Sequence, residues 1–255
     1  MKGTKIRWAD HSWNPVTGCT RVTPGCDHCY AETIATKFAG TAFPAGFEPT
    51  WKPHKLDDVR RWGPARVFVN SMSDVAHETF ADDQRDGVFD TMADCDKHQY
   101  LVLTKRPKVL WRYLCGEGGW LERRELVEVP DHIWLGVSIE NDRYTFRADW
   151  LRRIPVPVRF LSCEPLLGPL PSLSLEEISW VIAGGESGPG YRPMDHDWAI
   201  DLRDRAIGAG VAYYFKQSAA PRTEMGIELD GELWEQYPRP HPSRAELPQA
   251  HTLDV

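Results

Sequence analysis

Six short apolar segments, separated by helix-like segments, most strongly limit the fold of this 255-residue chain. Each segment is nearly continuous in apolar residues, as expected for strands buried on both faces of a parallel sheet. An additional opening strand is predicted around Ile6–Trp8. The six predicted strands are 66–70, 99–104, 132–137, 157–161, 178–183 and 211–215, and the predicted helices are 79–94, 107–114, 141–153 and 195–209.

Repeated strand–helix alternation predicts an α/β fold with parallel strands. Six or seven such units suit a partial (β/α)6–7 barrel over residues 1–217, with its chemistry where strands end and loops begin. The remaining residues, 218–255, are predicted to form a small C-terminal extension. It begins with a hairpin at 227–234 that turns at Asp-Gly and continues as a poorly ordered tail.

Composition narrows the classes of function. The formal net charge of −7 disfavours a protein that coats DNA without regard to sequence. No stretch approaches the roughly 18 apolar residues of a membrane span. The first residues lack the apolar run of a signal peptide, so we expect a cytoplasmic protein, in the bacterial host if a phage encodes it.

Three cysteines lie close together near the start of the chain, at Cys19, Cys26 and Cys29, in a C-x6-C-x2-C pattern. Disulfides are rare in the cytoplasm, so this group predicts a metal or cluster site. An all-protein [4Fe–4S] site needs four thiolates, and three would leave one iron open. Structural zinc also prefers four ligands, and the candidates for the fourth are His11, His28 and His54.

The loop resembles that of the radical S-adenosylmethionine (SAM) superfamily, whose commonest motif is C-x3-C-x2-C with an aromatic residue before the last cysteine. Here the second half matches, His28 takes the aromatic position, and the first gap is six residues. The longer stretch from Trp13 to Glu32 is similar to an uncharacterised phage-associated family. That similarity also includes residues 70–74, 103–107, 135–141, 162–166 and 184–188.

The resemblance implies a radical SAM fold and enzyme. Cys19, Cys26 and Cys29 would hold a [4Fe–4S] cluster whose open iron binds SAM. Reductive cleavage would give methionine and a 5′-deoxyadenosyl radical that abstracts hydrogen from a substrate. An external electron donor of the flavodoxin or ferredoxin type is also implied, while isomerase, lyase and transferase outcomes stay open.

All strand-end motifs would reach the same barrel mouth. After the second strand, Ser71, Ser73 and Asp74 are candidates for the SAM amino group, with a helix cap as the alternative. After the third, Lys105 and Arg106 could hold the SAM carboxylate or a substrate phosphate, with a solvated pair as the alternative.

Later strand ends supply further candidates for SAM. Glu140 and Asn141 could bind the SAM ribose, although Asn141 could instead cap the next helix. Gly184, Gly185 and Glu186 could form a backbone platform for adenine or phosphate, or a plain turn.

Two candidates lie closer to the reacting substrate. Glu164 is expected to contact it, and Cys163 could donate a hydrogen atom to a radical or simply pack in the core. Lys216 and Gln217 would line the mouth at the end of the last strand.

The expected substrate is a small molecule, a nucleotide or a DNA base in a phage context. Aromatic residues interleaved with arginines could stack on bases and bind phosphates, or only pack and be solvated. These residues are Trp13, Trp51, Trp62, Arg60, Arg61 and Arg66.

Two alternatives stay open. One is a zinc-stabilised, non-catalytic phage protein that binds DNA or a host protein. The other is a hydrolase built on Asp74, His77, Glu78 and Glu164.

Overall fold

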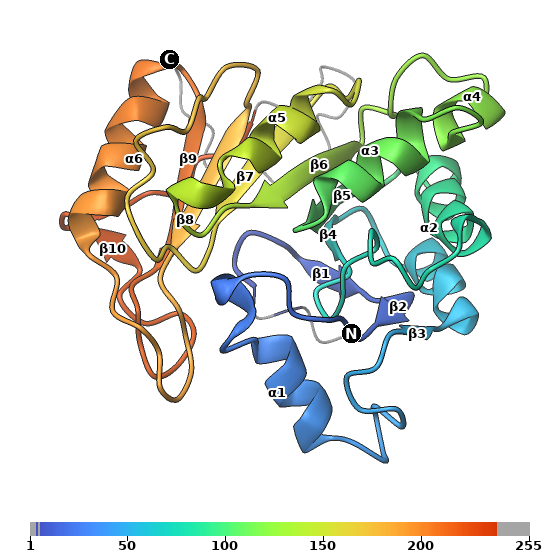
Figure 1. Cartoon of the computed structure of the whole chain (residues 1–255), viewed down its shortest axis with the longest axis horizontal. Helices are drawn as coiled ribbons and strands as arrows, with labels where there is room; N and C mark the ends of the chain where they lie inside the picture. The colour runs from blue at the N-terminus through green and yellow to red at the C-terminus, as the bar shows by residue number, and fades with distance from the viewer. Residues whose placement is uncertain (1–3, 5, 239–255) are drawn as a thin grey trace.

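Seven parallel strands form one curled half-barrel sheet in the computed structural model, which describes residues 4 and 6–238 (Figure 1). The strands lie in the sheet in the same order as in the chain, so each is a neighbour of the next. Their bounds are β1 (His11–Trp13), β4 (Arg66–Val69), β5 (Gln99–Thr104), β6 (Ile133–Ser138), β7 (Arg159–Cys163), β8 (Trp180–Gly184) and β9 (Ala212–Gln217). The predicted parallel α/β fold is confirmed.

Helices follow most strands and cover one face of the sheet (Figure 1). Two small antiparallel pairs lie outside the main sheet: β2 (Val16–Thr17) with β3 (Thr50–Trp51), and β10 (Glu228–Leu229) with β11 (Glu232–Leu233). The helices are α1 (Tyr30–Lys37), α2 (Asp82–Asp94), α3 (Pro107–Cys115), α4 (Trp120–Arg123), α5 (Phe146–Arg152) and α6 (His196–Gly208), with 3-10 turns η1 (Pro24–Cys26), η2 (Pro53–Arg61) and η3 (Asp142–Tyr144).

The predicted opening strand at Ile6–Trp8 is wrong. Those residues form a turn in which the Ala9 N–H donates to the Ile6 carbonyl, and the first strand comes later, at β1. The apolar character of this segment instead reflects Trp8, whose ring is buried in the inner core. The predicted hairpin is confirmed at β10 and β11, whereas the end of the predicted tail, 239–255, lies outside the described residues.

Side-chain alternation divides the core between the two faces of the sheet. Val67, Val69 and the residues at the same alternate positions of the other strands pack under the helices. Phe68 and the residues at the intervening positions point to the inner face of the half-barrel. The inner face is filled largely by aromatic side chains, which form a floor beneath the carboxyl ends of the strands. This floor contains Trp8, Phe68, Trp134, Phe160, Trp180 and Tyr214.

Gly136 gives this floor the space that it needs. A methyl group at Gly136 would lie 2.4 Å from ring atoms of Phe160, which is fully buried. We expect Gly136→Ala to lower the free energy of unfolding by about 1–3 kcal/mol, because an overpacked core must shift its backbone or rings. Urea denaturation would measure this. The control is Gly63→Ala, where nothing lies within 4 Å of the added carbon, and an equal loss there would contradict the reason given.

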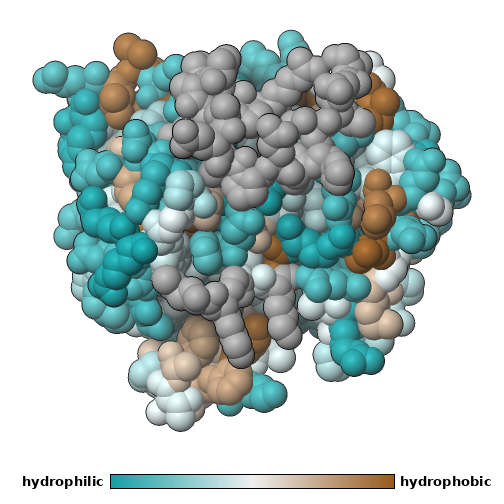
Figure 2. All heavy atoms as spheres, turned by 180° about the vertical axis from the view of Figure 1, so that it is seen from behind, coloured by the Kyte–Doolittle hydropathy of each residue, from teal (hydrophilic) through white to brown (hydrophobic). Residues whose placement is uncertain are grey.

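None of the helices within the described residues is long and apolar enough to cross a membrane. On the face seen in Figure 2, hydrophobic side chains form small separate groups among hydrophilic ones.

Because all seven strands run parallel, their carboxyl ends share one edge of the sheet, and the loops that follow them meet there.

Candidate active site at the carboxyl edge of the sheet

The loop that carries the three cysteines extends along this edge. It follows the first strands, passes through η1, and ends at Cys29, which is the residue immediately before α1. Cys19, Cys26 and Cys29 are all partly exposed, whereas Cys95 and Cys163 are buried. The three thiols that the sequence singled out are therefore the accessible ones near the strand ends.

Burial keeps two of these thiols protonated. Burial and the charge of Asp74 raise the pKa of Cys19 to about 11, although Arg106 opposes the rise. Burial likewise raises the pKa of Cys29, while backbone amides in α1 and the charge of Lys105 act against it. The charge of Cys26 raises the pKa of both Cys19 and Cys29. A cation bound to these thiols would therefore release protons.

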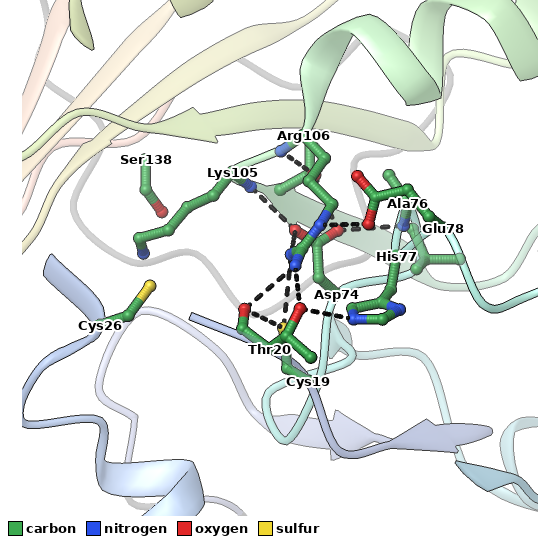
Figure 3. Close-up of polar contacts among 12 residues, drawn as sticks. Cys19, Thr20, Cys26, Asp74, Ala76, His77, Glu78, Lys105, Arg106 and Ser138 are labelled. Carbon is green, nitrogen blue, oxygen red and sulfur yellow. Dashed lines mark hydrogen bonds and ion pairs between the residues drawn. The ribbon is translucent and has the colours of Figure 1, made fainter. Parts of the chain in front are cut away.

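Arg106, which follows β5, holds the Cys19 end of the loop (Figure 3). Its Nη1 donates to Cys19 Sγ at 3.4 Å and to Asp74 at 3.2 Å. Its Nη2 donates to the Thr20 carbonyl at 3.0 Å, and its Nε donates to Glu78 at 2.9 Å. The side chain of Arg106 is buried, so these contacts fix its direction.

Lys105 points from the end of β5 toward Cys26 in Figure 3. No hydrogen bond or ion pair joins its Nζ to any described residue, and its charge acts on Cys29. Of the two basic residues predicted to bind an anion here, Arg106 is engaged by the protein, while Lys105 keeps a free ammonium group. Lys105 is therefore the better placed to bind a carboxylate.

The side chains of Asp74, Ser71 and Ser73 form hydrogen bonds with other parts of the protein. Asp74 accepts from Thr104 Oγ1 at 2.7 Å, from the Lys105 and Ala76 amides at 3.0 Å, and from Arg106. Ser73 Oγ donates to the Val16 carbonyl, and the Ser71 hydroxyl meets the Asn14 amide. The two serines join the segment after β4 to the start of the cysteine loop, whereas Asp74 joins that segment to the end of β5.

Asn70, in the motif after β4, is a further candidate that the structure adds to those predicted from the sequence. It is 3% exposed, and neither its Oδ1 nor its Nδ2 has a hydrogen-bond partner. Its φ of 62° lies in the left-handed region, which asparagine tolerates better than most residues. Strand alternation places it after Phe68 on the inner face, and an unpaired buried amide there suits a ligand.

Glu186, which follows β8, holds the other end of the cysteine loop. His28 Nδ1 lies 2.8 Å from its Oε2, and Arg192 donates to it from Nε and from the backbone amide. Arg192 Nη2 also donates to the Pro24 carbonyl at 2.9 Å. Burial acts to raise the pKa of Glu186, but the hydrogen bonds from Arg192 and His28 outweigh it and lower the pKa.

Glu140 lies under the middle of the loop and is completely buried. Its Oε2 accepts from Arg147 Nη1 at 2.9 Å, while its Oε1 has no hydrogen-bond partner. A methyl group at Gly25 would lie 3.1 Å from the Glu140 carboxyl carbon, so the loop packs directly on this side chain. Asn141 caps η3 by accepting from the Arg143 amide, as the alternative interpretation of that residue predicts.

Glu164 and Lys216 form an ion pair across β8. Lys216 Nζ lies 3.3 Å from Glu164 Oε1, and Ser162 Oγ donates to Glu164 Oε2. Both side chains are partly exposed. They meet above Gly184, where a methyl group would lie 2.7 Å from Glu164 Oε1, so a glycine is needed for this approach.

The other residues of the last strand ends have structural contacts. Gly185 packs on the backbone of Ala219, and Gln217 donates to the Gly185 carbonyl. Cys163 is fully buried in the core beneath the helices, and burial raises its pKa strongly. That position favours packing over hydrogen-atom donation.

The predicted aromatic and arginine surface is not assembled at this edge. Trp13 is buried and donates to the Lys55 carbonyl, while Trp51 and Trp62 pack against the core beneath the helices. The arginines pair with carboxylates: Arg60 with Asp57 and Asp94, Arg61 with Asp58, and Arg66 with Asp10. These residues therefore fit the alternative interpretation, in which the tryptophans pack in or against the core and the arginines form ion pairs.

The hydrolase candidates fall into two separate groups. Asp74 and Glu78 both contact Arg106, and His77 contacts Thr20, whereas Glu164 pairs with Lys216. Within residues 4 and 6–238, no three His, Cys, Asp or Glu side chains are grouped as for a single metal ion.

These features define an α/β half-barrel protein with a three-cysteine loop fastened over the carboxyl edge of its strands. The chain belongs to the family described as "Protein of unknown function (DUF5131)", whose model matches residues 3–238. A search of curated proteins found no match.

Solved structures of spore photoproduct lyase are similar to this chain at low identity. One, complexed with the dinucleoside spore photoproduct, is 12% identical with a TM-score of 0.43, covering 80% of this chain and 63% of that one. A mutant with the same dinucleoside is 12% identical with a TM-score of 0.44, covering 84% and 57%. This chain thus spans less than two thirds of the length of those proteins.

Protonation of Glu186 should weaken the end of the loop that it holds. Its folded-state pKa lies below the ordinary value of 4.5, so its ionised form stabilises the fold above that pH, and the contribution is lost as pH falls through the lowered pKa. We expect the stability difference between wild type and Glu186→Gln to be largest near neutral pH and to shrink below pH 4.5. Urea titrations across this range would measure it, with Glu32→Gln, at a more exposed ion pair, as control. A constant difference would refute the linkage.

Proposed function

We propose that this protein is a radical SAM enzyme in which Cys19, Cys26 and Cys29 hold a [4Fe–4S] cluster. The observation that carries the proposal is the position of these three partly exposed thiols, on one loop along the carboxyl edge of a parallel half-barrel. Three thiolates leave one iron free for a ligand from outside the protein. When bound and reduced, the cluster with SAM supplies a 5′-deoxyadenosyl radical.

Unpaired polar groups around the loop fit a polar ligand beside such a cluster. Lys105 offers a free ammonium group for a carboxylate, and Asn70 offers an amide with both polar atoms unpaired. Glu140 keeps one buried carboxylate oxygen without a hydrogen bond. We assign SAM contacts to these three residues, and we assign Ser71, Ser73 and Asp74 to holding the loop.

The ion pair of Glu164 and Lys216 is assigned to the substrate. It lies on the inner side of β7 and β9, is partly exposed, and has aromatic residues beneath it. Paired donors and acceptors of this kind suit a polar substrate such as a nucleotide or DNA base. A phage context and an external electron donor of the flavodoxin or ferredoxin type belong to the same proposal.

Anaerobic reconstitution with iron and sulfide tests the proposal. We expect a brown protein with about four irons per chain, bleached by dithionite, that releases 5′-deoxyadenosine from SAM. A colourless protein with one tightly bound zinc would overturn the proposal in favour of a zinc-stabilised binding protein.

A further inference from the structure

The six residues between Cys19 and Cys26 accept hydrogen bonds from two arginines of the barrel, one near each end of the segment. Near one end, the carbonyl and the hydroxyl of Thr20 accept from Arg106 Nη2, at 3.0 and 2.9 Å. Near the other end, the carbonyl of Pro24 accepts from Arg192 Nη2 at 2.9 Å. Arg106 follows β5 and Arg192 follows β8, so this segment passes the ends of β6 and β7 between its two contacts.

Both arginines are oriented by buried carboxylates. Asp74 and Glu186 are each 5% exposed, and they pair with Arg106 and Arg192 respectively. A guanidinium held by a carboxylate keeps its remaining N–H groups in a fixed direction, and here those groups point at loop carbonyls. The two ends of the segment are therefore built alike, although they share no sequence motif.

Each contact is linked to a different cysteine. On the first side, Arg106 also donates to Cys19 Sγ, and the Cys19 amide donates to the Phe47 carbonyl. On the second side, the Pro24 carbonyl also accepts from the Asp27 amide, which lies between Cys26 and Cys29.

We propose that residues 20–25 are a strap whose ends are fixed independently, with Arg106 positioning Cys19 and Arg192 positioning Cys26 and Cys29. The strap accounts for the long first gap of the motif, since two anchors on non-neighbouring strands need a segment that reaches both. Both arginines are positioning residues. The relevance of the strap to a cluster rests on the proposed function, whereas the strap itself does not.

Amide hydrogen exchange on the iron-free full-length chain tests the strap. Lysine keeps the charge of arginine but cannot form the same fork of hydrogen bonds. We expect Arg106→Lys to speed exchange about tenfold at Gly18–Val22 and to leave Cys26–Cys29 unchanged. Arg192→Lys should give the opposite pattern. A loss of general stability would not produce such crossed effects.

Arg21→Gln is the matched control, because Arg21 lies in the same segment but forms an exposed ion pair with Glu32. It should change exchange in neither half. Should Arg106→Lys fail to fold, Glu78→Gln is used in its place, because it removes one exposed contact of Arg106. Glu186→Gln, which removes the ion pair of Arg192, is the corresponding substitute for Arg192→Lys.

Equal changes in both halves, or none in either, would overturn the strap even in a protein that binds four irons. Crossed effects in a protein that binds no cluster would overturn the proposed function and leave the strap standing.

Discussion

Serine in place of Cys19, Cys26 or Cys29 is expected to abolish the reconstituted cluster, with iron falling from about four per chain to below about one. Each substitution replaces a soft thiolate with a hydroxyl that does not ionise at neutral pH, and no fourth cysteine compensates within this loop. Release of 5′-deoxyadenosine should be lost together with the iron. Iron and sulfide analysis after anaerobic reconstitution would measure the first effect directly.

Cys115→Ser is the matched control for these three variants. Cys115 is also partly exposed, but it lies at the end of α3, away from the loop. It should keep the full iron content and the same absorption spectrum. If Cys19→Ser alone retained four irons, the cluster would need a different third ligand, and the assignment of the six-residue gap would be wrong.

The fold was largely predictable from the sequence, because strands buried on both faces produce nearly continuous apolar runs. All six of the later strands follow this pattern. The first strand does not, since His11 and Ser12 are only half-buried at the edge of the sheet, where β1 pairs with β4 alone. The apolar segment at Ile6–Trp8 resembles a strand more closely, since three residues cannot distinguish a strand from a turn with one buried tryptophan.

The position of the candidate site was predictable for the same reason, since parallel strands bring all their carboxyl ends to one edge. The individual contacts between residues of the site were not predictable. The approach of His28 to Glu186 joins residues 158 positions apart, and Arg192 lies outside every motif that the sequence offered. Such pairs depend on how the sheet curls, and the spacing of residues along the chain does not predict that curl.

The Gly184-Gly185-Glu186 motif could be located from the sequence, whereas the contacts of its three residues could not. Its place after a predicted strand suggests a backbone platform for adenine or phosphate, with a plain turn as the alternative. In the structure each residue has a protein partner: Gly184 gives room to the Glu164 side chain, Gly185 packs on Ala219, and Glu186 holds His28. The small size of the two glycines serves close packing at the end of β8.

Asp74→Ala is expected to lower the free energy of unfolding by about 3–5 kcal/mol, the range for breaking a buried ion pair from one side. Asp74 is 5% exposed and accepts hydrogen bonds from two backbone amides, from Thr104 and from Arg106. Removing its carboxylate leaves the Arg106 guanidinium buried, with Glu78 as its remaining ion-pair partner among the described residues. Urea denaturation of the iron-free protein would measure the loss.

Glu78→Gln separates the buried pair from the exposed one. Glu78 contacts the same arginine, but its side chain is 61% exposed, so we expect its loss to cost no more than about 1 kcal/mol. A similar cost for both variants would mean that water replaces the Asp74 carboxylate and that Arg106 is not anchored from within the core. A large difference would show that Arg106, which also donates to Cys19 and Thr20, is anchored mainly by its buried ion pair with Asp74.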